Sequence, residues 1–148
     1  MSDVKVTIGD AGEVLQFGPT RVRILEDGSG TENRISAITS MMAPHTDGPP
    51  SHVHLMHDEA FLVTSGVLRF MMGDVQRDAK AGDYVVVPPG APHTFVNASD
   101  EPVSFLTTFT PAFYISSFRE LAQLNATGRL NAQTLAEVLT RYATVTCD

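Results

Sequence analysis

The sequence predicts an all-β domain that ends in a helical hairpin. Three observations support this fold class. Short runs rich in Val, Ile, Phe and Thr follow one another from Val4 to about Phe109, and turn residues interrupt them roughly every eight to twelve positions. The apolar period then changes to a helical one. Finally, 148 residues with 43% hydrophobic content suit one domain with one core, which we expect over residues 1–148.

The predicted strands are short, and glycines stand at or near their ends. Their composition and the punctuation between them are typical of an antiparallel sandwich or barrel, expected over residues 1–110. The expected strands are 13–17, 20–26, 33–42, 51–55, 59–65, 67–73, 83–89, 93–97 and 103–109.

A helical tail is expected over residues 111–148. Behind a candidate cap at Asn131, apolar residues recur at i, i+3, i+4 and i+7, namely Leu135, Val138, Leu139 and Tyr142. Upstream, 117–120 (SFRE) has the pattern of a capping box, and Gly128 is a candidate helix stop. The resulting hairpin would pack on the outside of a sheet or cover the mouth of a pocket.

Charge and cysteine content exclude several classes of function. The net charge is −7 and no basic cluster occurs, so a nucleic-acid partner is not expected. Cys147 is the only cysteine, which rules out an intrachain disulfide and a thiolate-rich metal site and suits a reducing compartment. No segment reads as a signal peptide or a membrane span, so we expect a cytoplasmic protein without a membrane partner.

Three histidines and a glutamate stand out as candidate ligands. His52 and His54 are two residues apart, so on a strand their imidazoles share one face. If 55–58 forms a hairpin turn, Glu59 starts the returning strand, and His93 begins a later strand that can reach back to the first pair. Two such histidines alone would more often be half-exposed polar residues. The second segment favours a metal site.

The two segments resemble the two signature motifs of the cupin superfamily. The motifs here read His52-x-His54-x4-Glu59-x6-Gly66 and Gly82-x5-Pro88-x-Gly90-x2-His93-x3-Asn97. The resemblance implies a cupin-type jelly-roll β-barrel with the C-terminal helical hairpin, and one divalent metal ion (Fe, Mn, Ni, Co or Zn) held by His52, His54, Glu59 and His93.

Such a ligand set favours a catalytic metal. Three neutral imidazoles and one carboxylate leave a divalent ion with a residual charge of about +1 and open coordination positions. A structural zinc site, the alternative, is closed by four ligands that usually include thiolates.

The remaining polar residues of these segments are assigned smaller roles. His57 is a candidate fifth ligand, but its place in the expected turn favours a solvent-facing position or one beside the ligands. His45 lies in a loop and is expected on the surface. Asp58 should alternate away from the metal.

Residues 36–145 are similar to the quercetin 2,3-dioxygenase-like branch of small cupins. This resemblance implies a metal-dependent dioxygenase, an oxidoreductase that activates an aromatic or enolisable small molecule for reaction with O2. Glu59 would also accept the substrate's hydroxyl proton, with His57 as the next candidate base. The candidate pocket residues, each of which is also a candidate for ordinary core packing, are Met41, Phe61, Phe70, Met72, Phe95, Phe109 and Phe113.

Other functions are compatible with the same motifs. A non-oxidative metal cupin, such as an isomerase, cyclase, decarboxylase or lyase, would use the same ligands, and a binding protein without turnover is the alternative from another class. Resemblance to small cupins also implies a homodimer, in which residues 13–17 or 20–26 pair with the partner's sheet.

Overall fold

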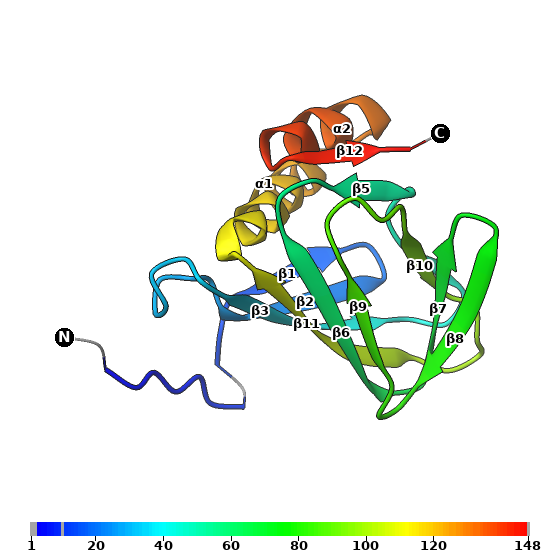
Figure 1. The fold of residues 1–148 in the computed structure, drawn as a ribbon, viewed down its shortest axis with the longest axis horizontal. Coiled ribbons are helices and arrows are strands. Elements are labelled where there is room, and N and C mark those ends of the chain that lie inside the picture. The colour runs from blue at the N-terminus through cyan, green and yellow to red at the C-terminus, as the bar shows by residue number, and fades with distance from the viewer. Residues whose placement is uncertain (1–2, 10, 148) are drawn as a thin grey trace.

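Two antiparallel sheets face each other and form the walls of a jelly-roll barrel, with a pair of helices at one end (Figure 1). This computed structural model describes residues 3–9 and 11–147. The predicted fold class, an all-β barrel of cupin type with a helical hairpin, is confirmed. In the part of the chain that is described, no helix has the length and apolar character needed to cross a membrane.

The larger sheet has the strand order β1-β2-β3-β11-β6-β9. Its strands are β1 (Val14–Phe17), β2 (Thr20–Glu26), β3 (Ser36–Met42), β11 (Val103–Thr110), β6 (Asp58–Ser65) and β9 (Tyr84–Val87). Strand β2 lies between β1 and β3, so the expectation that residues 20–26 pair with a partner's sheet is wrong. Strand β1 is at the sheet edge, and the Asn125 side chain donates to its Gln16 carbonyl at 3.3 Å.

The smaller sheet has the order β4-β10-β7-β8. It consists of β4 (Thr46–Asp47), β10 (Thr94–Asn97), β7 (Val67–Met72) and β8 (Val75–Lys80). Strand β8 was not predicted, because five of its six residues are exposed and its composition is largely polar. Gly66 makes the turn from β6 to β7 with a φ of 76°, and a Cβ there would lie 2.4 Å from the Pro102 carbonyl oxygen.

The apolar residues form two clusters. In the barrel interior, Phe61 packs against Phe70 and Phe95 with ring centroids 5.0 and 5.5 Å apart. The second cluster joins the barrel to the hairpin, and Phe109 and Tyr114 lie near its centre. Because the hairpin contributes to this cluster, it is part of the folded core.

The helical tail consists of the short 3-10 helix η1 (Ala112–Tyr114), α1 (Ile115–Ala126) and α2 (Ala132–Arg141). The expected cap is confirmed, since the Asn131 side chain accepts a hydrogen bond from the Thr134 amide. Gly128, with a φ of 71°, follows the end of α1 as expected. The capping box at 117–120 is wrong, because η1 leads directly into α1 and Ser117 instead donates to the Tyr114 carbonyl.

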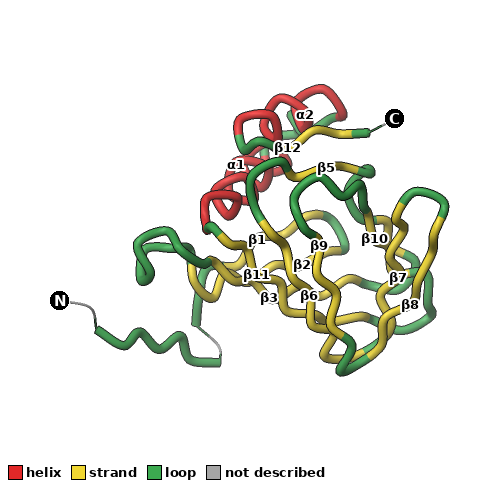
Figure 2. Tube along the Cα trace, in the orientation of Figure 1, coloured by secondary structure: helices red, strands yellow, loops and turns green. Residues whose placement is uncertain are grey.

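After α2 the chain returns to the barrel as β12 (Thr144–Thr146), which pairs with β5 (His52–His54). The tube view shows the helices and this strand pair together at one end of the barrel (Figure 2). Strand β12 was not predicted.

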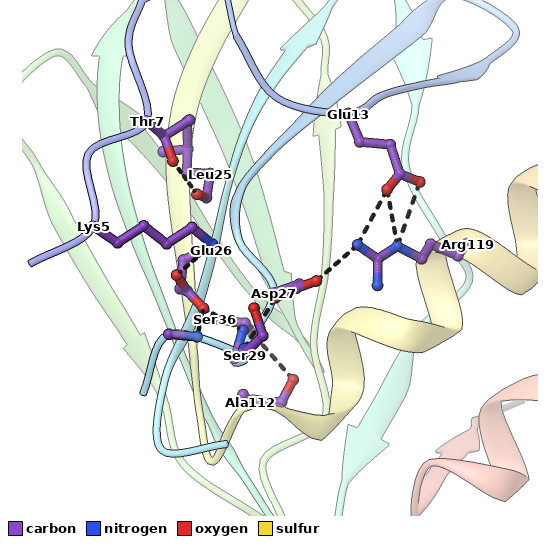
Figure 3. A network of polar contacts seen from close by, with 12 residues as sticks. Lys5, Thr7, Glu13, Leu25, Glu26, Asp27, Ser29, Ser36, Ala112 and Arg119 are labelled. Atoms are coloured by element: carbon purple, nitrogen blue, oxygen red, sulfur yellow. Dashed lines mark hydrogen bonds and ion pairs between the residues drawn. The ribbon is translucent and has the colours of Figure 1, made fainter. Parts of the chain in front are cut away.

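Polar contacts fasten the beginning of the tail to the N-terminal part of the chain (Figure 3). Arg119 of α1 contacts Glu13 and Asp27, each at 3.1 Å, and the Ser36 hydroxyl donates to the Ala112 carbonyl at 3.0 Å. Lys5 pairs with Glu26 at 2.9 Å. The Arg119 contacts hold α1 against the end of the larger sheet.

Candidate metal centre

The four candidate ligands come from three places in the fold. His52 and His54 lie on β5, Glu59 lies on β6, and His93 immediately precedes β10. All four are buried, and one potential ligand atom from each lies within 4.8 Å of the others. The structure therefore brings together the residues that the two motifs single out.

Strand β5 is held on both sides. On one side it pairs with β12, and on the other His52 exchanges two backbone hydrogen bonds of 3.0 Å with His93. The predicted return of His93 to the first pair is confirmed. The expected hairpin of β5 with the Glu59 strand is wrong, because β6 belongs to the larger sheet, where it pairs with β11 and β9.

Each candidate imidazole is oriented through its Nδ1 atom. The Nδ1 of His52 lies 2.8 Å from the Pro50 carbonyl oxygen, and that of His93 lies 3.0 Å from the Ala91 carbonyl oxygen. These oxygens accept, so both Nδ1 atoms carry hydrogen and both Nε2 atoms are free to bind a metal.

His54 is oriented by a residue of the tail. Its Nδ1 lies 2.9 Å from the hydroxyl oxygen of Thr144, which is fully buried and donates its own proton to the Tyr142 carbonyl at 3.1 Å. The hydroxyl therefore accepts from Nδ1, so the Nε2 of His54 is also free for a metal. Sequence reasoning missed Thr144, since the contact spans 90 residues.

The Glu59 carboxylate is the negative centre of the cluster. Its Oε2 lies 2.6 Å from Nε2 of His54 and 3.5 Å from Nε2 of His93. Burial alone would raise the pKa of Glu59, but the contacts with His54 and His93 lower it well below its usual range. Burial opposes a charged His93, yet the nearby Glu59 raises its pKa. Burial, with a contribution from His93, lowers the pKa of His52 to about 4.

These observations fit a bound divalent metal. The Nε2 of His93 is buried without a hydrogen-bond partner. Because the proton of His54 is on Nδ1, the lone pair of its Nε2 points at a carboxylate oxygen of Glu59, an arrangement that a second proton or a bound cation would stabilise. Three imidazole nitrogens and one carboxylate suit Fe, Mn, Ni, Co or Zn. His52, His54, Glu59 and His93 are therefore the residues that would hold the ion.

His57 is buried beside His54, so of its two expected positions the one beside the ligands is found and the solvent-facing one is wrong. It is 1% exposed because Phe109, Phe113 and Tyr114 surround its ring, with centroids 4.6–5.8 Å away. Its ring lies 4.1 Å from that of His54, and neither of its nitrogens has a hydrogen-bond partner among the described residues. Burial, with a contribution from His54, lowers the pKa of His57 to about 4.

The two other polar residues lie as expected. His45 is on the surface, with 63% of its side chain exposed, and contacts Asp100 at 2.6 Å. Asp58 is exposed and points away from the cluster.

A cavity of about 320 Å³ lies between the barrel and the hairpin and reaches the candidate ligands. His52 and Glu59 lie on its wall, whereas the other walls are mainly apolar. The hairpin contributes Phe118, Leu121, Leu130, Leu135 and Leu139. Of the two expected positions for the hairpin, the structure favours the one that covers a pocket.

The predicted pocket residues lie in different surroundings. Phe95 lines the cavity. Phe61, Phe70 and Met72 pack in the barrel interior, and Phe109 packs between barrel and hairpin. Met41 is 40% exposed on the outer face of the larger sheet, and Phe113 lies beside His57.

Tyr114 is a further cavity residue that sequence reasoning missed. Its ring lies 4.6 Å from those of His54 and His57. Burial and the charge of Glu59 raise its pKa, so its hydroxyl stays protonated and can donate a hydrogen bond into the cavity. Its place at the junction of η1 and α1 gave no sequence signal of this role.

Residues 39–109 match the family model described as a cupin domain. No curated protein matches the chain in sequence. Among solved structures, KdgF from Halomonas sp. superposes with a TM-score of 0.63 and 19% identity over 72% of this chain and 94% of that one.

Two further structures give similar values. A Cupin 2 conserved barrel domain protein from Salinispora arenicola CNS-205 has a TM-score of 0.62 and 19% identity, covering 80% of this chain and 98% of that one. The polyketide cyclase RemF from Streptomyces resistomycificus has a TM-score of 0.56 and 20% identity, covering 76% and 86%. At these identities the likeness shows the fold. Together with the family match, it shows that residues 39–109 form a cupin domain and that the chain has a cupin-type fold.

Proposed function

We propose that this protein is a metal-dependent enzyme that acts on a small aromatic or enolisable molecule, and that its reaction is a quercetinase-like dioxygenation. The carrying observation is that His52 and Glu59 lie on the wall of the apolar cavity, whereas His54 and His93 complete the cluster behind them. A group held by these residues is thus next to a space that can hold a ligand. The apolar walls suit an aromatic guest.

When bound, a divalent metal would supply Lewis-acid stabilisation of a negatively charged substrate oxygen. The protein's own residues would orient the substrate and accept its proton. Glu59 is the proposed proton acceptor, because it lines the cavity and its carboxylate is ionised. Tyr114 is a proposed hydrogen-bond donor to the substrate. His57 is the next candidate base, although it lies behind His54 and not on the cavity wall.

The same arrangement supports a non-oxidative reaction as the second candidate. Proton abstraction by Glu59 next to a metal-stabilised oxygen is also the chemistry of isomerases, cyclases and lyases. A polyketide cyclase is among the structures that share this fold. A protein that binds a ligand without turnover is the third outcome.

We also propose a homodimer formed through the N-terminal region. Val4, Val6 and Ile8 are 94%, 76% and 68% exposed, and they alternate with Lys5 and Thr7, which contact Glu26 and the Leu25 carbonyl. The edge strand β1 belongs to the same part of the protein. A second copy that covers this apolar row would remove it from water.

Anaerobic reconstitution followed by oxygen-electrode assays tests the proposed reaction. Metal-free protein is loaded separately with Fe(II), Mn(II), Ni(II) and Co(II) and mixed with quercetin or with small enolisable acids. We expect oxygen uptake with at least one metal, and none with His93→Ala treated identically. Substrate conversion without oxygen uptake would favour the isomerase or lyase class. Binding without conversion would favour a binding protein.

A further inference from the structure

We infer that the cavity selects a substrate with an uncharged apolar body, and that the α1–α2 hairpin is the element that makes this selection. The inference deepens the proposed function and rests on it in one respect, since it places the polar end of the substrate at His52 and Glu59. It separates this protein from enzymes whose substrates carry a phosphate or sulfonate away from the reacting group.

The charges around the cavity oppose a second anionic group. Among the described residues that line it, none is Lys or Arg, and Asp47 adds a carboxylate. The charge of Glu59 would be balanced by a bound metal. The arginines of β2 do not help, because Arg21 and Arg23 alternate with the inward-facing Val22 and lie on the other face of the sheet. A phosphate or sulfonate in the cavity would lose its hydration without gaining an ion pair.

The hairpin leaves apolar surface open to the cavity. Leu121, Leu130 and Leu135 line the cavity and are only partly buried by the rest of the protein. An apolar ligand would cover these side chains, which gives binding a driving force that a hydrated ligand cannot use. Phe95 and Phe105 of the barrel line the same cavity and give it an aromatic wall.

The size of the cavity also indicates a ligand site. Its volume of about 320 Å³ exceeds the water-sized voids of a packed core and lies at the lower end of small-molecule cavities, roughly 300–1,000 Å³. A compact ring system with one oxygen substituent fits this combination of volume, wall and charge.

Isothermal titration calorimetry with a matched pair of compounds tests the inference without turnover. The neutral compound is 2-naphthol, and the charged one is 6-hydroxy-2-naphthalenesulfonate, which has the same ring system and hydroxyl. We expect one 2-naphthol to bind per chain with a negative heat-capacity change, and the sulfonate to bind at least tenfold more weakly. Equal or tighter binding of the sulfonate would overturn the inference.

Variants of the hairpin test its role as the selecting element. Leu135→Lys should weaken 2-naphthol binding at least tenfold and reduce the preference against the sulfonate, whereas Leu135→Met should retain both. Leu130→Lys, between the two helices, gives the same test if Leu135→Lys does not fold. Leu55→Lys is the control, because Leu55 is 55% exposed and does not line the cavity. Folded lysine variants at 130 and 135 that bind like the parent would refute the hairpin's role.

The calorimetry and the oxygen assay fail independently. If 2-naphthol binds selectively but no substrate consumes oxygen, the dioxygenase proposal fails and the selectivity of the cavity stands. If oxygen is consumed but 2-naphthol does not bind, or binds no better than the sulfonate, the selectivity inference fails alone.

Discussion

Replacing Thr144 by Val should weaken metal binding, although Thr144 is not a ligand. The substitution keeps the shape of the side chain but removes the hydroxyl that accepts from His54 Nδ1 at 2.9 Å and donates to the Tyr142 carbonyl. Without that acceptor, His54 is free to move its proton from Nδ1 to Nε2, the atom that faces Glu59. A proton there must be removed before a metal can bind.

The magnitude follows from the buried groups that lose their partner. An unsatisfied buried donor costs about 1–3 kcal/mol, which at about 1.4 kcal/mol per tenfold corresponds to a loss of roughly 5- to 150-fold in affinity. Loss of outer hydrogen-bond partners of metal-binding histidines typically costs about 10- to 100-fold. We therefore expect Thr144→Val to weaken metal binding by about 10- to 100-fold, and Thr144→Ser to stay close to the parent.

Chelator competition measures the affinity, and nitrogen-15 NMR of the histidine rings reports the His54 tautomer in the metal-free protein. Thr146→Val is the matched control, because Thr146 lies on the same strand but is only half-buried. A Thr144→Val protein that binds metal like the parent and keeps the proton on Nδ1 would refute the reasoning. If the serine and valine variants lose affinity equally, the effect comes from packing and not from the hydrogen bond.

Four further predictions concern the cluster and the assembly. His93→Ala should abolish metal binding, whereas His57→Ala should leave metal content nearly unchanged; metal analysis of both variants checks the assignment. Glu59→Gln should keep its metal but lose turnover by about 10²- to 10⁴-fold. If activity falls only in proportion to metal content, Glu59 is a ligand alone. In the metal-free protein, the free energy of unfolding should fall as the pH is lowered from about 6.5 to about 4, because in this range His52 and His57 are protonated only in the unfolded chain. Urea titrations measure this, and a stability that does not change with pH would contradict the prediction. Light scattering should give the mass of a dimer, and Val6→Asp should shift it toward one chain.

Much of the cluster could be predicted because its information is local. The two-residue spacing of His52 and His54 fixes their common face, and the apolar strand before His93 indicates where the next strand begins. The Asn131 cap and the helical period of α2 are equally local signals. Strand β8 was missed for the opposite reason, since an exposed polar strand carries no apolar alternation.

The features that could not be predicted depend on contacts between distant parts of the chain. Alternation shows which phenylalanines face inward, but whether one fills the core, as Phe61 does, or lines the cavity, as Phe95 does, depends on where the hairpin packs. The burial of His57 likewise depends on Phe109 and Phe113. Neither arrangement leaves a trace in the local sequence pattern.

The pairing of β12 with β5 has a consequence for the order of folding. Strand β5 emerges from the ribosome well before its partner, since His54 and Thr144 are 90 residues apart. Closing so long a loop costs conformational entropy, and this cost is offset only when both helices have packed and β12 reaches the barrel. The barrel can therefore form before His54 is oriented, and a nascent or partly folded chain would hold its metal weakly. Metal uptake should thus be one of the last steps in the maturation of this protein.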